Sequence, residues 1–227
     1  MLAITPEYQD RLDRVEEILD AYYGIPDWHE YLPAVDELVC TILSQNTNDI
    51  NRDKAFVKLK ETFSNWEEVR DADPEAVKEA IRIAGLANQK GPNIQAALQF
   101  ITQERGEIDL DWLKEKTPEE TMNWLTQMKG VGLKTASIVM VFSLDMPAFP
   151  VDTHVYRVTG RLALRPEKMT IDNAHRWFMS SNRPESFGSL HLNIISLGRD
   201  FCQARKPKCG ACPVEKLCQY NEKNFDA

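Results

Sequence analysis

Four of the chain's five cysteines lie together near its C-terminal end, in the segment CQARKPKCGACPVEKLC. Their spacing, C-x6-C-x2-C-x5-C, runs from Cys202 through Cys209 and Cys212 to Cys218. The N-terminal sequence lacks the basic-then-apolar layout of a secretory signal, so a metal centre explains these thiols better than a disulfide framework. Four thiolates can hold a zinc ion or an iron–sulfur cluster. Structural zinc sites usually use two short knuckles, and only Cys209 and Cys212 form one here, which favours the cluster.

The rest of the sequence carries the signals of a helical fold. Capping side chains stand directly before a first-turn proline in three places, Thr5-Pro6, Asp73-Pro74 and Thr117-Pro118. Two pairs, Ser64 with Glu67 and Thr117 with Glu120, have the spacing of a capping box. Apolar residues repeat at helical period, and strand-like alternation bounded by Asn-Gly or Asp-Gly turns is absent from the sequence. We therefore expect an all-α protein of about ten helices.

Charge is distributed unevenly along the chain. The net charge is −8, which taken whole argues against a nucleic-acid binder. Residues 1–127 hold 13 Lys and Arg against 26 Asp and Glu, whereas residues 128–227 hold 14 against 9. The basic second part is compatible with a face that meets a polyanion, and the acidic first part with ordinary solvation of helices. No run of 18 apolar residues indicates a transmembrane helix.

The segment MKGVGLKTASIVMVFSL, residues 128–144, joins a Gly-Val-Gly turn to an apolar helix. Gly130 and Gly132 would let the backbone approach a ligand, and the helix N-terminus would offer unpaired N–H groups to a phosphate. A tight turn between helices explains the same glycines. Lys134 falls in the first turn of that helix, where the helix dipole and partial burial would both disfavour a cation. A neutral lysine can form a Schiff base, and a lysine that reaches solvent is the alternative.

Two further stretches contain residues of interest. In FPVDTHVYRVTGRL, residues 149–162, Asp152 or Thr153 is expected to cap the following helix. His154 is interpreted as structural, because no second metal ligand or base pairs with it in the sequence. Cys40 lies in the apolar stretch ELVCTILSQ and is interpreted as a small core residue.

The order of these motifs resembles that of one known family. KGVGLKTA, then PVDTHVYRV, then the cysteine spacing form a signature similar to that of the endonuclease III family of helix-hairpin-helix DNA glycosylases. LSQNTND, at residues 43–49, looks like the family's early motif. The resemblance implies an all-α fold of two domains. Residues 29–146 would form a six-helix barrel that contains the hairpin, and residues 1–28 with 147–227 would form a domain that carries a [4Fe-4S] cluster on the four cysteines.

The resemblance also implies roles for single residues. Lys134 aligns with the family's catalytic lysine and Asp152 with its catalytic aspartate, while Gln45 matches the residue that fills the gap left by an extruded base. Met128 and Lys129 replace the usual Leu-Pro of the hairpin, which leaves the glycines of the turn in place. Relatives that attack adenine mismatches lack the lysine, so Lys134 implies a bifunctional enzyme. The candidate contacts to DNA phosphates are Lys129, Gly130, Gly132, Arg199, Arg205, Lys206 and Lys208.

The implied function is base excision repair by a DNA N-glycosylase with AP lyase (β-elimination) activity, which removes oxidised pyrimidines. The implied partner is double-stranded DNA with damaged bases or abasic sites, bound by a monomer in the cytoplasm, at the nucleoid, without a membrane. Two alternatives stay open at this point. One is a mismatch-specific uracil or thymine glycosylase, or an AP lyase, of the same fold. The other is a non-catalytic iron–sulfur protein that binds DNA.

Overall fold

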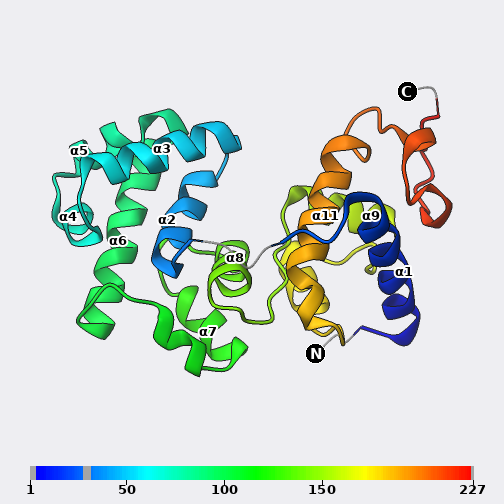
Figure 1. Cartoon of the computed structure of the whole chain (residues 1–227), viewed down its shortest axis with the longest axis horizontal. Helices are drawn as coiled ribbons and strands as arrows, with labels where there is room; N and C mark the ends of the chain where they lie inside the picture. The colour runs from blue at the N-terminus through cyan, green and yellow to red at the C-terminus, as the bar shows by residue number, and fades with distance from the viewer. Residues whose placement is uncertain (1–3, 28–31, 226–227) are drawn as a thin grey trace. The chain divides into compact units, whose positions relative to one another are not determined.

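This computed structural model describes residues 4–27 and 32–225, and all of their regular secondary structure is helical (Figure 1). These residues contain no strand, so the predicted all-α class is confirmed. None of the described helices has the length and the apolar character needed to cross a membrane.

The chain divides into two compact units. Unit 1 consists of Met1–Glu30 with Pro147–Ala227, and unit 2 consists of Tyr31–Met146. The predicted domain boundary between residues 28 and 29 falls outside the described residues. The names that the resemblance gave to the two domains therefore stay predictions, and each unit is described by itself below.

Unit 2 is built around two apolar helices. α2 (Ala34–Ser44) and α8 (Leu133–Ser143) are buried over most of their surfaces and pack against each other. Cys40 of α2 is 8% exposed, and burial raises the pKa of its thiol to about 12, as expected of a core cysteine. The other helices of this unit are α3 (Asp49–Thr62), α4 (Trp66–Asp71), α5 (Pro74–Ala80), η1 (Arg82–Ala84), α6 (Ala87–Arg105), η2 (Asp111–Glu115) and α7 (Pro118–Leu125).

Three helices begin at the predicted prolines. α5 follows Asp73, whose side chain accepts a hydrogen bond from the amide of Glu75 at 2.8 Å. α7 follows Thr117, which forms the predicted capping box with Glu120. α1 (Pro6–Tyr23) follows Thr5, but the Thr5 side chain makes no capping hydrogen bond. The first two caps are therefore confirmed in full, and the third only in its position.

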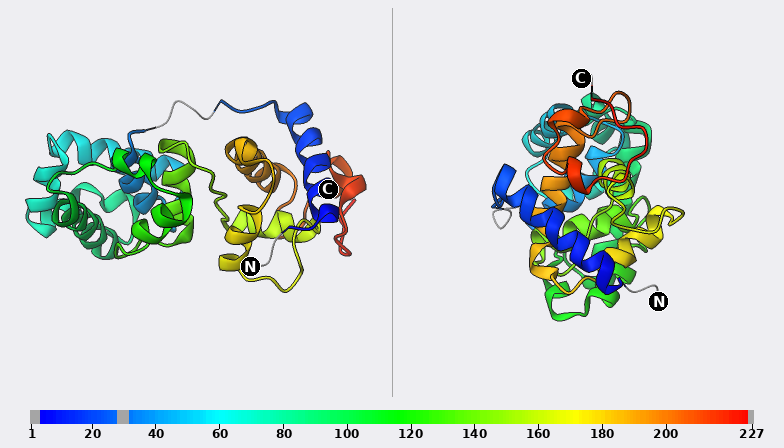
Figure 2. Two further views of the ribbon diagram at one scale, coloured as in Figure 1. Left: turned by 90° about the horizontal axis from the view of Figure 1, so that it is seen from below. Right: turned by 90° about the vertical axis from the view of Figure 1, so that its right-hand side faces the viewer.

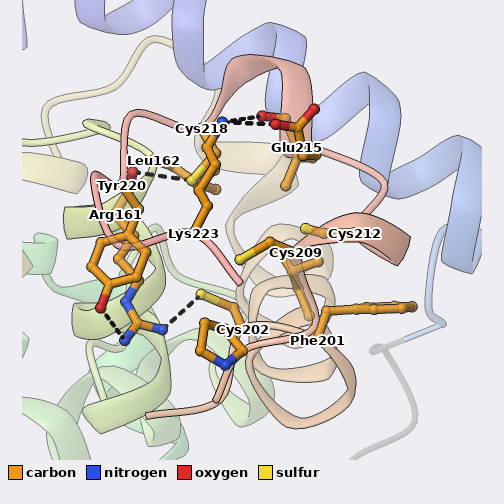
Figure 3. A pocket seen from close by; sticks show the side chains of 13 residues that line it. Arg161, Leu162, Phe201, Cys202, Cys209, Cys212, Glu215, Cys218, Tyr220 and Lys223 are labelled. Atoms are coloured by element: carbon orange, nitrogen blue, oxygen red, sulfur yellow. Dashed lines mark hydrogen bonds and ion pairs between the residues drawn. The ribbon is translucent and has the colours of Figure 1, made fainter. Parts of the chain in front are cut away.

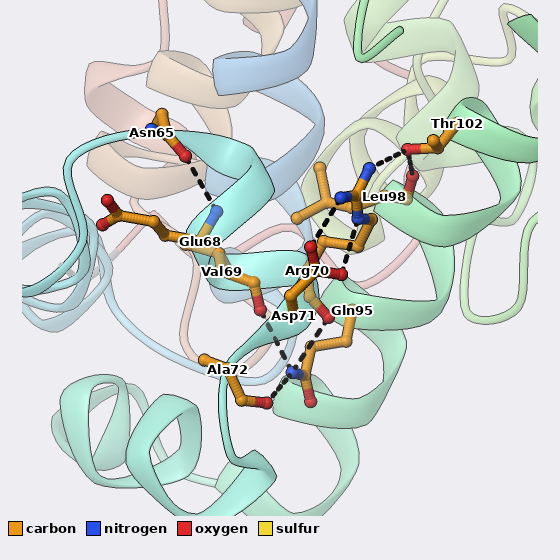
Figure 4. Close-up of polar contacts among 9 residues, drawn as sticks. All are labelled: Asn65, Glu68, Val69, Arg70, Asp71, Ala72, Gln95, Leu98 and Thr102. Atoms are coloured by element: carbon orange, nitrogen blue, oxygen red, sulfur yellow. Dashed lines mark hydrogen bonds and ion pairs between the residues drawn. The ribbon is translucent and has the colours of Figure 1, made fainter. Parts of the chain in front are cut away.

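The start of α4 differs from the prediction. The pairing of Ser64 with Glu67 was wrong, because the helix is capped one residue later by Asn65, whose side chain accepts from the amide of Glu68 at 2.8 Å (Figure 4). Glu68 in turn accepts from the amide of Ser64 at 2.7 Å. At the other end of α4, the buried side chain of Gln95 on α6 donates to backbone carbonyls (Figure 4). Both ends of this short helix are thus satisfied by side chains.

Unit 1 combines the two ends of the chain. The apolar face of α1 packs against α11 (Phe187–Asp200), which also packs against α9 (Thr153–Arg161) (Figure 2). Asn193 of α11 donates from Nδ2 to Asp20 of α1 at 2.9 Å, so polar contacts reinforce the apolar packing. The remaining helices of this unit are α10 (Ile171–Phe178), η3 (Pro184–Ser186), η4 (Cys209–Ala211) and η5 (Glu215–Leu217).

Candidate functional site

The turn between α7 and α8 carries the Gly-Val-Gly motif. Gly130 has a φ of +83°, and a Cβ at this position would lie 2.3 Å from Nδ2 of Asn93, a buried residue of α6. The left-handed φ and the close approach both require glycine. Met128 and Val131 are buried on either side and anchor the turn. Gln45, directly after α2, donates from Nε2 to the Gly130 carbonyl at 3.0 Å, so these two predicted contact residues are neighbours.

The surroundings of Gly132 differ from those of Gly130. It is the N-cap of α8 with a φ of −98°, and a Cβ there would meet nothing within 4 Å. The fold by itself therefore does not require glycine at this position. The first N–H groups of α8 have no partner within the helix, and the open space in front of them suits an anion. The interpretation as a tight turn accounts for Gly130 but leaves Gly132 unexplained.

Lys134 is the second residue of α8, and its side chain is exposed. The expectation of partial burial was therefore wrong. The buried face of the helix begins with the next two residues, Thr135 and Ala136, which are 4% and 0% exposed. The exposed amine follows directly on the turn that contains the two glycines.

Asp152 caps α9, as predicted. Its Oδ1 accepts a hydrogen bond from the amide of Val155 at 2.7 Å, and the side chain is half-buried. No described residue donates a hydrogen bond to the other carboxylate oxygen, Oδ2. The cap fixes the orientation of the carboxylate and leaves one oxygen for another partner.

Two buried histidines hold the segment that leads to Asp152. Nδ1 of His175 on α10 donates to the Phe149 carbonyl at 3.1 Å, and Nδ1 of His191 on α11 donates to the Pro150 carbonyl at 2.9 Å. The two imidazoles are 1% and 3% exposed. They fix consecutive peptide units two and three residues before Asp152. Nothing in the sequence singled out these histidines, because each lies within an ordinary amphipathic helix.

His154 belongs to a structural network, as predicted. Arg157 donates from Nη2 to Nδ1 of His154 and to the carbonyl of Gly198, both at 3.0 Å, and from Nε to the carbonyl of Cys202 at 2.8 Å. Because the guanidinium is always a donor, Nδ1 of His154 is the acceptor and the ring proton sits on Nε2. Burial lowers the pKa of His154, which agrees with a neutral ring.

The four predicted cysteines line one pocket, together with apolar side chains (Figure 3). Arg161 points at this pocket and donates from Nη1 to Sγ of Cys202 at 3.4 Å, while its guanidinium stacks on Tyr220 with 4.1 Å to the ring centroid. Glu215 also lines the pocket but pairs with Lys223 at 2.8 Å. A set of four soft thiol ligands with a guanidinium beside it suits an iron–sulfur cluster, whose thiolates carry negative charge. The cysteines are Cys202, Cys209, Cys212 and Cys218.

The loop between the first two cysteines presents three cations. Arg205, Lys206 and Lys208 are exposed, and within the described residues none of them forms an ion pair. Lys206 has a φ of +50°, so the loop bends sharply at its tip. This basic loop lies in unit 1 with Asp152, whereas Lys134 lies in unit 2. The predicted pairing of Lys134 with Asp152 therefore stays a prediction.

Two family models match the chain. Residues 39–181 match the model described as HhH-GPD superfamily base excision DNA repair protein. Residues 202–218, which span the four cysteines, match the model of the iron-sulfur binding domain of endonuclease III. The two matched segments include Gln45, Lys134, Asp152 and the four cysteines, whereas His191 lies between the segments and Tyr220 and Lys223 follow the second one.

Comparisons with individual proteins agree with the family models. Endonuclease III of Sulfolobus acidocaldarius is 33% identical over 185 residues, which cover 81% of this chain and 80% of that protein. A putative DNA glycosylase of Arabidopsis thaliana is 41% identical over 133 residues, which cover 59% of this chain but only 45% of the plant protein. Among solved structures, a non-covalent complex of endonuclease III with DNA matches with a TM-score of 0.78 and 25% identity. That match covers 93% of this chain and 95% of the solved one.

Proposed function

Because the chain belongs to the endonuclease III family of the HhH-GPD superfamily of base excision DNA repair proteins, we propose that it removes oxidised pyrimidines from duplex DNA. It acts as a DNA glycosylase and then as an AP lyase, the pair of activities that its family carries out. Its substrate is duplex DNA that contains a damaged base or an abasic site, and it binds this DNA as a monomer, at the nucleoid. Unit 2 corresponds to the six-helix barrel and unit 1 to the cluster domain.

The observation that carries this proposal is the exposed amine of Lys134 at the start of α8. It follows a turn whose shape is imposed by Gly130 and the buried Asn93. A primary amine on a rigid element next to an anion site is what a Schiff-base mechanism on a DNA sugar needs. Gly132 leaves space for a phosphate in front of the amides of α8.

The chemistry then proceeds in two stages. The target nucleotide leaves the base stack, at a cost of a few kcal/mol that is smallest for a damaged base. The Lys134 amine attacks C1′ of the deoxyribose, the C1′–N bond to the base breaks, and the base departs with that bonding pair. The amine gives up one proton, which is passed on to the departing base. Oδ2 of Asp152 accepts the proton of the attacking amine, or stabilises the positive charge that develops on the sugar.

The second stage cleaves the strand. The lysine nitrogen and the opened sugar form a protonated Schiff base, which makes the C2′ proton acidic. Loss of that proton expels the 3′ phosphate by β-elimination, so that the strand breaks on the 3′ side of the lesion. Water then hydrolyses the Schiff base and releases Lys134 for another cycle.

The cofactor is a [4Fe-4S] cluster, which the four cysteines hold. When bound, it links the four cysteines of residues 202–218 to one another and takes no part in the reacting bonds. The chain's own contribution is the basic loop between Cys202 and Cys209, both of whose ends the bound cluster would hold in place. Arg205 and Lys206 then contact DNA phosphates, which position the duplex without reading its sequence.

Borohydride trapping tests the proposal. The parent protein and Lys134→Ala are mixed with a duplex that contains thymine glycol, and separately with one that contains an abasic site. Reduction converts a Schiff base into a covalent adduct whose mass can be measured. Lys116→Ala, which replaces another exposed lysine of unit 2, is the matched control and should still form the adduct.

Each outcome decides a part of the proposal. Adducts on both duplexes that disappear in Lys134→Ala support an oxidised-pyrimidine glycosylase with lyase activity. An adduct on the abasic duplex alone refutes the proposed base preference and leaves a lyase. No adduct on either duplex, in protein that retains its cluster absorbance, refutes the lysine mechanism and favours a DNA-binding protein without catalysis.

A further inference from the structure

One lysine of unit 2 is fully buried. Lys90 lies on α6 and is 1% exposed, although a lysine is almost never buried without a partner. Its Nζ donates to the carbonyl of Leu43 at 2.7 Å and to the carbonyl of Ala84 at 2.8 Å. Within the described part of the chain it pairs with no carboxylate. Burial of this kind is costly, so the two carbonyls must offset a large desolvation penalty.

The two carbonyls are the free ends of two helical elements. Leu43 lies in the last turn of α2, and the amide of Thr47, which would be its partner in a continued helix, binds Ser44 instead. Ala84 is the last residue of η1. The C-terminal end of a helix carries unpaired carbonyls and partial negative charge, which favours a cation. The Lys90 ammonium therefore joins two helix ends whose carbonyls accept no other hydrogen bond from residues 4–27 and 32–225.

The residues that follow these carbonyls are held in strained conformations. Asn46, three residues after Leu43, has a φ of +53°, and Leu86, two residues after Ala84, has a φ of +49°. Left-handed backbone at a residue other than glycine costs about 1–3 kcal/mol and persists only where the surroundings enforce it. The backbone amide of Lys90 also donates to the Leu86 carbonyl at 2.9 Å. The side chain of Lys90 is thus bonded three residues before Asn46 and two residues before Leu86, and its backbone amide is bonded to Leu86 itself.

The same face of α6 also supports the turn of the Gly-Val-Gly motif. Asn93, three residues after Lys90 and hence on the same side of the helix, lies against Gly130. Gln45, two residues after Leu43, donates to the Gly130 carbonyl at 3.0 Å. One buried stripe of α6 therefore sets the position of the segment that carries Gln45 and the position of the turn that precedes Lys134.

We propose that Lys90 is a positioning residue that fixes the Gln45 segment, residues 44–48, relative to the turn at residues 85–86. This inference rests on the proposed function, because Gln45 acts only if that segment meets DNA. Lys90 cannot be the nucleophile, since its ammonium is enclosed and committed to two carbonyls. Its loss would leave Lys134 in place but let the Gln45 segment shift, so extrusion of a base from a duplex would suffer more than the lyase step.

Lys90→Met tests this, because methionine keeps the length of the side chain and removes its donors. The control is Leu98→Ala, which removes a fully buried side chain about 12 Å farther along the same helix and lowers stability. Two single-turnover rates are compared in each protein. One is excision of thymine glycol from a duplex, and the other is strand cleavage at a preformed abasic site in single-stranded DNA. Amide hydrogen exchange at residues 44–48 and 85–87 is measured in parallel.

For Lys90→Met we expect the first rate to fall roughly 10- to 100-fold more than the second, the usual effect of a misplaced element. Exchange should rise in both segments, whereas Leu98→Ala should lower the two rates by the same factor. Equal losses in both variants, or unchanged exchange in Lys90→Met, would show that Lys90 only supports the core. If Lys90→Met does not fold, Lys90→Gln, which can still donate to one carbonyl, is judged by the same ratio.

Failure of the proposed function would look different. In that case the parent protein itself would not cleave the abasic strand, and the ratio of rates would have no meaning. The exchange measurement needs no activity, so it would still decide whether Lys90 orders the two segments.

Discussion

Replacing Gly130 by alanine tests how the turn before α8 is held. The left-handed φ of +83° costs an alanine about 1–2 kcal/mol. The new Cβ would lie 2.3 Å from Nδ2 and 2.7 Å from Cγ of Asn93, and Asn93 is 4% exposed and cannot swing away freely. Overpacking of this kind adds about 1–3 kcal/mol. We therefore expect Gly130→Ala to lower the free energy of unfolding by about 2–5 kcal/mol.

Gly132→Ala is the matched comparison, because the two glycines share one turn. A Cβ at Gly132 meets nothing within 4 Å and φ is −98°, so the change introduces no clash and no backbone strain. The loss of stability should be only about 0.5–1 kcal/mol, the difference between glycine and alanine at an N-cap. If the space in front of Gly132 takes a phosphate, the new methyl should nevertheless weaken DNA binding. The loss of one hydrogen bond to a charged group, about 1.5–3 kcal/mol, corresponds to roughly a tenfold or larger rise in Kd.

Urea unfolding and DNA titration are measured on the parent and both variants. The reasoning holds if Gly130→Ala loses clearly more stability than Gly132→Ala, and if Gly132→Ala loses affinity for DNA. It is refuted if the two variants are equally destabilised, or if Gly130→Ala unfolds within about 0.5 kcal/mol of the parent, the range of a neutral surface substitution. If Gly132→Ala bound DNA with unchanged affinity, the proposed phosphate contact at this position would be refuted.

Three more predictions concern other parts of the chain. Asn65→Ala should cost about 1 kcal/mol in urea unfolding through loss of the α4 cap, and an effect near zero would contradict the cap. Arg205→Ala and Lys206→Ala should each flatten the plot of log affinity against log salt by about 0.9 if each contacts a phosphate, and an unchanged slope would exclude that contact. Glu37 is 9% exposed, and burial raises its pKa in the folded protein, so stability is lost as the pH rises from the pKa of the unfolded chain through that of the folded protein. Glu37→Gln should therefore raise the melting temperature at pH 7 but not at acid pH, and a gain that is equal at both would contradict the burial argument.

Much of the fold could be predicted because the relevant signals are local. Proline after a capping residue located the starts of α5 and α7. The spacing of the four cysteines predicted a shared site, and their thiols line one pocket. The start of α4 was misplaced because Ser64 and Asn65 are both good caps, and only the packed structure selects Asn65.

The errors in the site have a different origin. Lys134 was expected to be partly buried because the residues after it are apolar, but in the first turn of a helix one position can face solvent while the next two face the core. Lys90 could not be found, because nothing local distinguishes a lysine whose ammonium reaches two carbonyls from one that reaches water. His175 and His191 were missed because their partners lie 26 and 41 residues away.

The packing of α1 against α11 has a consequence for how the protein is made. Residues 31–146 form one unbroken stretch of chain, and they can fold as soon as they leave the ribosome. α1 is synthesised first, but its partner α11 follows more than a hundred residues later. The apolar face of α1 therefore stays exposed to water until α11 has been made. Unit 1, which contains the basic loop, can complete its folding only after Cys218 has been added. During synthesis the amine that would attack DNA is therefore ready before the surface that would hold the DNA for it.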